Sequence, residues 1–516
     1  MHHASNESLL RLAPNPTEER IMILPTILVL AATLAPLPQS APDPTNVVVV
    51  GDEQTALNRR LYELVMNPDT TAEQLATVLK EGADPKAMAK SVGIQGSVGV
   101  MYHAAVNLRD PRAIEVLLDA GLVPSPYIVD TAIRFNSNFE VVKCIIDANK
   151  IAGAENPKLR ISKPTILLTT AARSNPNPAV IRFLLASGDH DVNKKDGVFA
   201  LTPFLLACQY NPSPEVLEAL IEAGADVDVQ GGSEKNPLPA LKLACISNPS
   251  LAVIEFLLDI GCDPTAPYPI GSPPYLSAAL SGRHPETFRL LVEHGADPNV
   301  VFGVDDAISN IVGINKNEGM LAGALEAGTQ LRTLQPDGES ILGLAVRNSS
   351  IDPLATLLDL GIDPNAGNTR PLSWCAVLTE RPEMVELLVD AGADLDHRTT
   401  LNSETFSLLT RGSNALMEAS FNLTKQAAAV LQAFVDTGIH VNATNDAGTT
   451  ALMMVASRRT DLGKQTVPMI RVLIEAGADP SRRDRKGRTA REIAEKNPKL
   501  QDVDLEAAFA PSGPVG

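Results

Sequence analysis

Apolar and polar positions follow one short pattern, which is clearest in LTPFLLACQYNPSPEVLEALIEAGADV, residues 201–227. Thr202 and Pro203 fit the N-cap and the first position of a helix, and an apolar stripe follows over about two turns. The helix is predicted to stop at Asn211, because a residue before proline is disfavoured in the helical conformation. The segment therefore opens with a short helix that starts at Pro203.

A second helix is predicted to begin at Ser213 and Pro214 in the same way. From Val216 onward, apolar residues recur at i, i+1, i+4 and i+5, which is one helix face. Gly224 fits the left-handed position that ends many helices, and an extended turn follows. Neither helix is long enough to be stable alone in water, so this helix hairpin must stack on copies of itself.

Glycines in the position of Gly224 recur along the chain, with a typical step of about 33 residues. They are Gly82, Gly121, Gly188, Gly224, Gly261, Gly295, Gly328, Gly361, Gly392, Gly438 and Gly477. The long step between 121 and 188 leaves room for one degenerate copy, Val141–Asn149. The chain therefore contains about twelve units.

Turns such as GADP, GADVD and GADPN follow most of these glycines, and partial boxes such as TPFLLAC and RPLSWCA open the first helices. The period and the residues of these turns and boxes resemble the ankyrin repeat, although the histidine of its T-P-L-H-x-A box is missing throughout. The resemblance covers roughly residues 54–497. It implies an all-α solenoid of stacked helix–turn–helix units with finger loops, which binds partners through its loop tips and inner helix row, on the concave side.

Three segments are expected. Residues 1–45 form a targeting segment and linker, 46–500 form the ankyrin-repeat solenoid, and 501–516 form a C-terminal cap helix and tail. The unit at Asp305–Ala327 contains three glycines, and glycine inside a helix costs about 1 kcal/mol relative to alanine. We therefore expect a weak point at 300–325.

Spacings above the basic period mark insertions, which in repeat proteins often form a binding face. They are Ile151–Lys163, Val229–Asn236, Thr265–Pro273, Leu395–Ser413 and Ser457–Pro468.

The composition says little more about the fold, but the net charge bears on which partners the protein can bind. Apolar residues make up 44% of the chain and aromatic residues only 4%, which predicts an aliphatic, alanine-rich core. The net charge of −18 disfavours nucleic acid and favours a basic protein partner, although it also serves solubility. A monomer is expected.

Residues Ile21–Ala35 form an apolar stretch without charge, and a proline-rich segment follows. The stretch is shorter than the about 20 residues of a membrane-spanning helix. Its length and the small residues after it fit a secretory signal peptide, so export is the first expectation. A membrane-tethered form, or a cytoplasmic protein with a buried cap helix here, are the alternatives.

The sequence offers no recognisable catalytic, metal or cofactor motif. Five cysteines lack metal-ligand spacing and sit at positions typical of small buried hydrophobic residues. The eight histidines are scattered, and neither a phosphate loop nor a dinucleotide motif occurs. No cofactor and no small-molecule substrate are predicted.

Aromatic and arginine side chains at helix ends and in insertions are the candidate partner contacts, since such residues often anchor interfaces. Each of them could equally pack within its own loop. They are Tyr210, Tyr268, Tyr275, Trp374, His397, Arg398, Phe406 and Arg411. A further candidate is the basic stretch 482–491, which we interpret first as a solvated turn entering a cap helix and second as a site for an acidic partner.

These features favour a non-catalytic, exported scaffold, adaptor or inhibitor that binds another protein. One alternative is a secreted effector whose repeats target a protein of a host or neighbouring cell. Another is an enzyme with a site hidden in the insertions.

Overall fold

The computed structural model describes most of the chain. The described residues are 47–48, 53–91, 97–161, 164–187, 190–233, 236–266, 272–302, 306–335, 338–367, 370–398, 411–459 and 464–510. The predicted signal segment, Tyr268 and Phe406 lie outside them. Within the described ranges, no helix has both the length and the apolar character needed to cross a membrane.

The helix hairpin predicted from the sequence is formed by α10 (Pro203–Tyr210) and α11 (Pro214–Glu222). The side chain of Thr202 accepts a hydrogen bond from a backbone N–H in the first turn of α10, as an N-cap does. Gly224 has a φ of +88°, the left-handed conformation predicted for it. Ser213 differs from the prediction, because its hydroxyl donates to a glutamate side chain of α11 and does not cap that helix.

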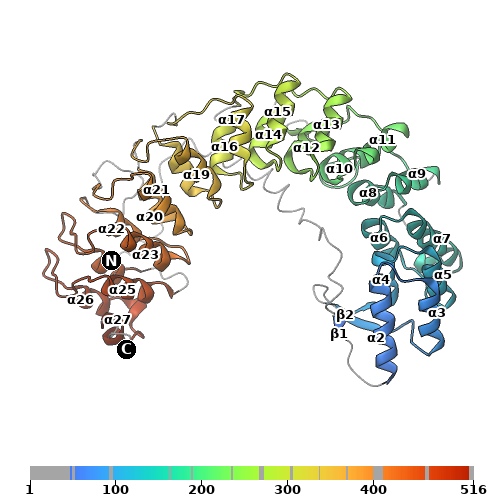
Figure 1. Ribbon diagram of the computed structural model, residues 1–516, viewed down its shortest axis with the longest axis horizontal. Coiled ribbons are helices and arrows are strands. Elements are labelled where there is room, and N and C mark those ends of the chain that lie inside the picture. Colours follow the sequence, from blue (N-terminus) through green and yellow to red (C-terminus); the bar gives the residue numbers. More distant parts are fainter. Residues whose placement is uncertain are drawn as a thin grey trace, which may run out of the picture. The chain divides into compact units, whose positions relative to one another are not determined.

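Two rows of helices build the first of two compact units. Its first helices are α2 (Glu53–Met66), α4 (Val100–Asn107), α6 (Pro126–Phe135), α8 (Pro164–Ser174), α10 and α12 (Ala240–Ser247). Its second helices are α3 (Ala72–Lys80), α5 (Pro111–Asp119), α7 (Phe139–Glu155), α9 (Pro178–Ala186), α11 and α13 (Leu251–Asp259). From α2 to α10, each first helix packs on the next, and the second helices do the same (Figure 1). The last three residues of α12, Cys245–Ser247, group with the second unit.

The second compact unit repeats this arrangement. Its first helices are α14 (Pro274–Ser281), α16 (Ala307–Gly313), α18 (Ile341–Arg347), α20 (Pro371–Leu378), α22 (Ala415–Ala419), α24 (Ala451–Ala456) and α26 (Ala490–Glu495). Its second helices are α15 (Glu286–Glu293), α17 (Met320–Glu326), α19 (Asp352–Asp359), α21 (Glu383–Asp390), α23 (Ala427–Asp436), α25 (Thr466–Glu475) and α27 (Leu505–Phe509). The described helices thus form thirteen pairs: the twelve counted from the sequence and the terminal pair α26–α27.

The core lies between the two helix rows and is aliphatic, as predicted. Leucine, isoleucine, valine and alanine supply most of its fully buried side chains, and few aromatic residues join them. Alanine is frequent because close approach of two helices leaves little room for a side chain between them.

A buried asparagine follows most first helices and bonds to the preceding repeat. Asn211 donates from Nδ2 to the carbonyl oxygens of Ala172 and Asn175, both at 2.8 Å, and its Oδ1 accepts from the N–H of Ser213 at 3.0 Å. Equivalent bonds are made by Asn136, Asn175, Asn248, Asn315, Asn348, Asn422 and Asn497. We call these residues the asparagine ladder. It satisfies carbonyl groups at the ends of the first helices, which would otherwise be buried without partners.

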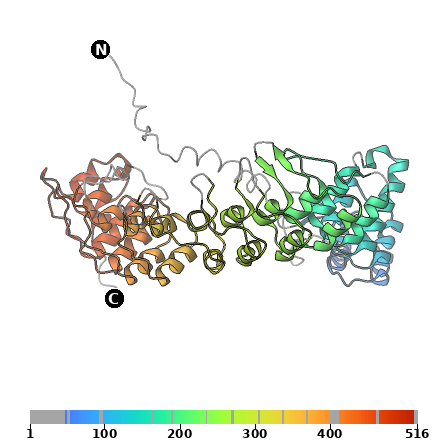
Figure 2. The same ribbon diagram turned by 90° about the horizontal axis from the view of Figure 1, so that it is seen from above.

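Two predicted insertions contain regular structure. Helix α7 continues to Glu155, so the start of the insertion at 151–163 is helical and not a loop. The insertion at 229–236 contributes to an antiparallel hairpin of β4 (Gly231–Ser233) and β5 (Asn236–Leu238), which extends away from the helices (Figure 2). A second small sheet joins β1 (Val47–Val48), β2 (Met88–Ser91) and β3 (Ser97–Gly99).

The glycines of the repeat predicted to be weak have distinct roles. Gly319 precedes α17 with a φ of +73°, a conformation that favours glycine. A Cβ atom on Gly323 would lie 2.7 Å from the carbonyl oxygen of Pro285, so glycine permits close packing of α17 on the preceding repeat. Gly313 has more room, since the nearest atom to its Cβ position is a methyl carbon of Leu344 at 4.0 Å. Weak stacking of this repeat therefore stays a prediction.

Candidate protein-binding surface

Polar and aromatic side chains share one face of α6. Tyr127, Asp130 and Arg134 are spaced i, i+3 and i+7, which places them on the same side of the helix. Arg134 Nε donates to Asp130 Oδ2 at 2.6 Å. The Tyr127 ring stacks on that of Tyr102 from α4, with centroids 6.1 Å apart and planes 12° from parallel. Tyr127 is 59% exposed, so this stack is open to solvent.

Arg173 of α8 continues the same surface. Its guanidinium lies 4.4 Å from the ring centroid of Tyr210 on α10. One turn earlier, the Thr170 hydroxyl donates to Asp130 Oδ1 at 3.2 Å, which shows that the polar faces of α6 and α8 adjoin. Burial lowers the pKa of Arg173; Tyr210 opposes this shift, and the neighbouring positive charge of Arg134 adds to it. The residues of this surface, which we call the arginine–tyrosine face, are Tyr102, Tyr127, Asp130, Arg134, Arg173 and Tyr210.

A second arginine–aromatic pair lies on the first helices of the second unit. The Arg347 guanidinium of α18 is 4.7 Å from the ring centroid of Trp374 on α20, and its Nη2 donates to Glu339 at 2.9 Å. Gly343 allows the indole to lie against α18, because a Cβ there would be 3.3 Å from Trp374 Cδ1. Trp374 therefore packs locally while one part of it stays exposed.

The remaining predicted contact residues fall into separate places. Tyr275 is only 1% exposed, and its hydroxyl hydrogen-bonds the Thr329 hydroxyl at 2.7 Å. The prediction of a partner contact is wrong for Tyr275, because its ring fills the core between repeats and its one polar atom is already bonded. Tyr268 and Phe406 lie outside the described residues.

His397, Arg398 and Arg411 border the insertion at 395–413 in the second unit. Arg398 Nη1 donates to the carbonyl oxygen of Gly412 at 3.1 Å, which brings the two ends of the insertion together. Arg411 Nε is 3.6 Å from Asp446 Oδ2. Half-burial lowers the pKa of His397, and nearby Arg370 lowers it further while Asp394 opposes the shift. His397, Arg398 and Arg411 belong to the second unit, whereas Tyr210, another predicted contact residue, belongs to the first.

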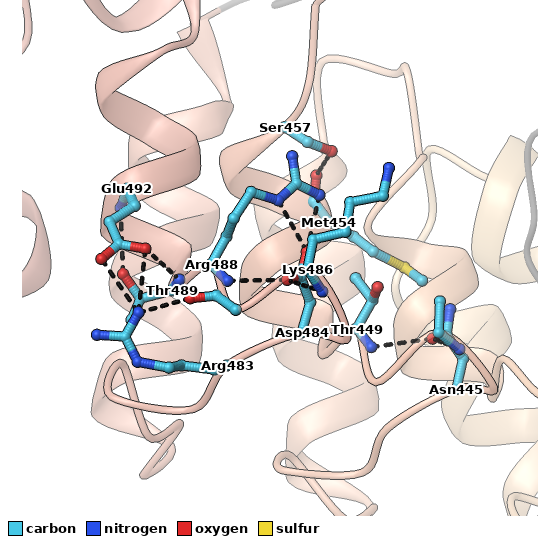
Figure 3. Close-up of polar contacts among 12 residues, drawn as sticks. Asn445, Thr449, Met454, Ser457, Arg483, Asp484, Lys486, Arg488, Thr489 and Glu492 are labelled. Atoms are coloured by element: carbon cyan, nitrogen blue, oxygen red, sulfur yellow. Dashed lines mark hydrogen bonds and ion pairs between the residues drawn. The ribbon is translucent and has the colours of Figure 1, made fainter.

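The basic stretch 482–491 forms a turn before α26, and acidic side chains neutralise most of its charge (Figure 3). Arg488 donates twice to Asp484 Oδ2, at 2.7 and 2.9 Å. Arg483 Nη1 donates to Glu492 Oε1 at 3.2 Å and to a turn carbonyl at 2.6 Å.

The other carboxylate oxygen of Asp484, Oδ1, accepts from the N–H groups of Lys486 and Arg488, both at 2.9 Å. Asn445 holds the corresponding turn one repeat earlier, where its Oδ1 accepts from the N–H of Thr449 at 3.0 Å (Figure 3). The same bonding in two successive repeats indicates a structural turn. The first interpretation of the stretch, a solvated turn entering a cap helix, therefore accounts for its arginines better than an anion site does.

Charge separates the two helix rows of the first unit. Helices α4, α6, α8, α10 and α12 carry three basic side chains and one acidic one. Helices α5, α7, α9, α11 and α13 carry ten acidic and four basic ones. In the second unit, the second helices hold eleven acidic and two basic side chains. Among these helices, acidic side chains thus lie mainly on the second helices.

The ionisable and thiol side chains that the structure describes bear on metal binding and catalysis. Over the described ranges, no three histidine, cysteine or acidic side chains come together as metal ligands would. Burial raises the pKa of Cys144 and of Cys262 to about 11, so both favour the unreactive thiol form. Glu418 of α22 is only 1% exposed, and burial raises its pKa to about 7 while a hydrogen bond from Ser373 opposes the shift. A carboxyl group closed off in this way cannot reach a substrate.

Sequence reasoning missed Asp130, Arg134, Arg173 and Arg347. A signal was available, because each of these arginines stands one or two residues before an asparagine of the ladder, in RFN, RSN and RN. Arg134 and Arg173 both stand two residues before the asparagine, so they occupy the same side of their helices, whereas Arg347 stands one residue before it. Without the ladder, these residues look like ordinary basic residues at helix ends.

The comparison with family models agrees with the repeat architecture. The family model described as "Ankyrin repeats (3 copies)" matches residues 168–268 and 204–301. No curated protein matches the sequence. Among solved structures, one similar chain belongs to the complex of a predatory endopeptidase from Bdellovibrio bacteriovorus with an immunity protein. The two share 22% sequence identity and a TM-score of 0.29 over 40% of this chain and 98% of that chain.

Family match and structure lead to one assignment. The match at 168–301 falls on α8 to α15, whose helix pairs carry the period, the left-handed glycines and the turns described above. Described helices on either side repeat the same pairing and stacking. Residues 168–301 of this all-α repeat protein belong to the ankyrin-repeat family.

Proposed function

We propose that this protein is a non-catalytic scaffold, adaptor or inhibitor that binds a partner protein through the first helices of its repeats and the adjoining loops. Ankyrin repeats are protein-interaction modules. The observation that carries the proposal for this chain is the pair of partly accessible arginine–aromatic contacts, Arg173–Tyr210 and Arg347–Trp374, one on the first helices of each unit. Arginine, tyrosine and tryptophan are the side chains that most often dominate binding energy at protein interfaces.

The test is affinity capture with the full chain, followed by a measured dissociation constant for the captured protein. Tyr210→Ala and Trp374→Ala should each weaken that constant by about tenfold or more if the residue anchors the partner. Glu218→Gln on the second helix α11 is the matched surface control and should leave the dissociation constant unchanged. A partner that binds all three variants equally well would contradict the choice of surface.

Absence of catalysis belongs to the same proposal. The buried carboxyl of Glu418 and the high thiol pKa values of Cys144 and Cys262 support it, because none of these groups is placed to react with a substrate. Purified full-length chain should leave its captured partner chemically unchanged after prolonged incubation, as judged by intact mass spectrometry. A mass change of the partner that requires this chain would overturn the proposal.

The second helices suggest a further property of the partner. Their excess of acidic side chains favours a basic protein surface wherever that row is contacted, and at the same time keeps monomers apart. We expect a monomer in light scattering and a binding constant for such contacts that weakens with added salt.

Export also remains a proposal, which rests on the apolar segment 21–35. Fractionation of cells that produce a C-terminally tagged chain tests it. An exported protein should be recovered outside the cytoplasm, shortened at its N-terminus. Recovery of the full-length chain only in the cytoplasm would exclude export.

A further inference from the structure

The arginine–tyrosine face differs in charge from the rest of its unit. The helices that build it are α4, α6, α8 and α10, and their charged side chains are Arg134, Arg173 and a single acid, Asp130. The opposite helix row is strongly acidic. A ligand that approaches this face therefore meets a local positive field within an acidic protein.

The two arginines have unequal internal partners. Arg134 is paired with Asp130, which also accepts a hydrogen bond from Thr170. Arg173 contacts the ring of Tyr210, and within the described parts of the chain no carboxylate lies at ion-pair distance from it. Of these two guanidinium groups only that of Arg134 has a carboxylate partner, so the charge of Arg173 is not compensated by an ion pair within the described residues.

Apolar surface borders these charges on the same helices. The Tyr102–Tyr127 stack adjoins Ile128 and Phe135, which pack against the Tyr102 side chain and remain partly exposed. Ile166 on α8 is 43% exposed and stands seven residues before Arg173, on the same helix face. Aromatic and aliphatic surface beside a cation suits a ligand that combines a carboxylate with apolar side chains.

We propose that the arginine–tyrosine face binds an acidic segment of a partner protein, with a carboxylate paired to Arg173 and Arg134 and an apolar side chain on the Tyr102–Tyr127 stack. This inference rests on the proposed function and specifies the chemistry of its partner at one site. It assigns to this face the opposite charge preference from that of the acidic second helices. The guanidinium is already oriented by the Tyr210 ring, so pairing with a carboxylate loses little side-chain entropy.

The test uses full-length protein and three fluorescein-labelled twelve-residue peptides, with binding followed by fluorescence anisotropy. One peptide alternates aspartate or glutamate with leucine and phenylalanine. In the second, asparagine and glutamine replace the acids, and in the third, lysine replaces them. The acidic peptide should bind most tightly, and its affinity should fall as salt is added.

Arg173→Gln and Arg134→Gln should each weaken binding of the acidic peptide by about tenfold, the effect of removing one partner of a charge-assisted pair. Arg182→Gln is the matched control, since Arg182 is an exposed arginine of α9 that pairs with Glu222 at 3.0 Å on the second-helix row. It removes the same charge and should change the affinity less than twofold. Unchanged thermal unfolding of the three variants confirms that they remain folded.

Equal effects of Arg173→Gln and Arg182→Gln, preference for the lysine peptide, or no binding of the acidic peptide would each overturn the inference. The proposed function has a separate readout, the captured partner. If that partner binds Arg134→Gln and Arg173→Gln normally but loses affinity for Trp374→Ala, the protein is a binding module whose partner does not use this face. If no partner is captured but the acidic peptide binds with the expected arginine dependence, the chemistry of the face stands while the wider proposal fails.

Discussion

Asn211 makes three hydrogen bonds from a fully buried amide, two of them to the preceding repeat. Asn211→Ala should destabilise the protein by about 3 kcal/mol, because it leaves buried carbonyl groups with fewer partners and removes one bond within its own repeat. Urea unfolding of the full chain measures the change. Asn211→Asp keeps the acceptor but loses the two donated bonds, so it should be at least as destabilising.

Asn193 provides the control for that prediction. Its amide also bridges two repeats, to Gly224 O at 2.9 Å and to the Asp226 N–H at 2.8 Å, but at an exposed turn where water can replace the lost bonds. Asn193→Ala should therefore lower the free energy of unfolding by less than about 1 kcal/mol. Equal losses at Asn193 and Asn211 would show that burial of the ladder contributes nothing.

His103 makes the first unit sensitive to acid. The ring is fully buried between the rings of Tyr62 and Tyr102, and burial lowers its pKa from 6.5 to about 4. Between these two pH values the unfolded chain binds the proton more readily, so the free energy of unfolding falls as pH drops below 6.5. The loss attributable to this group should reach about 3 kcal/mol near pH 4.

Unfolding of the full chain from pH 7.5 to 4 measures this effect. His103→Phe should flatten the pH dependence, and it should also stabilise the protein at neutral pH by removing a polar ring whose two nitrogens find no hydrogen-bond partner among the described residues. His440→Gln, at an exposed position of the second unit, is the histidine variant with which His103→Phe is compared. A parallel slope in His103→Phe would show that other groups cause the acid sensitivity.

At the scale of the element, a glycine in α16 and a glycine in α17 differ in whether the surrounding structure leaves room for a side chain. Gly313→Ala should stabilise the protein by up to about 1 kcal/mol, because alanine is the better helix former and the nearest atom to the new Cβ is 4.0 Å away. Gly323→Ala should destabilise it by about 1–3 kcal/mol, since its Cβ would lie 2.7 Å from the backbone of Pro285.

Thermal unfolding of both variants beside the unmodified chain is the measurement. The two substitutions are chemically identical and lie in one repeat, so each serves as control for the other. Stabilisation by both would mean that helix propensity alone governs this repeat, as the sequence-based expectation of a weak point assumes.

Several elements were predictable from local chemistry. A cap residue followed by proline defines the start of α10, and a left-handed glycine defines the end of α11, because these are short-range requirements of the backbone. The extension of α7 to Glu155 was not predictable, because the usual terminal glycine is absent there and nothing local stops the helix. Ser213 does not cap α11 because its hydroxyl is turned toward the Glu215 side chain, to which it donates at 2.6 Å, and not toward the free N–H groups of the helix.

At the scale of the whole molecule, a destabilising substitution in one repeat should affect only the neighbouring repeats. Leu220 of α11 is fully buried, and Leu220→Ala should cost about 2–5 kcal/mol through the cavity that it leaves. In a stack where each repeat contacts only its neighbours, the loss should be felt in the adjacent repeats and fade beyond them.

Hydrogen exchange of the full chain, read peptide by peptide, tests this. Protection should fall in α8 to α13 and stay unchanged in α2, α3 and the helices after α20. The exposed substitution Glu218→Gln, also on α11, should leave every peptide unaffected. Uniform loss of protection along the chain would indicate a single cooperative core instead of stacked repeats.

The sequence by itself determined the repeat, its period, the helix pairs and the aliphatic core, because each depends on residues close together in the chain. Only the tertiary structure decided which side chains meet between repeats. It buried Tyr275, paired Arg173 with Tyr210, and aligned the asparagines into a ladder, since partners in these contacts lie some 30 to 55 residues apart. A pattern read along one helix shows which face a residue occupies, but the neighbouring repeat decides whether that face is core or surface.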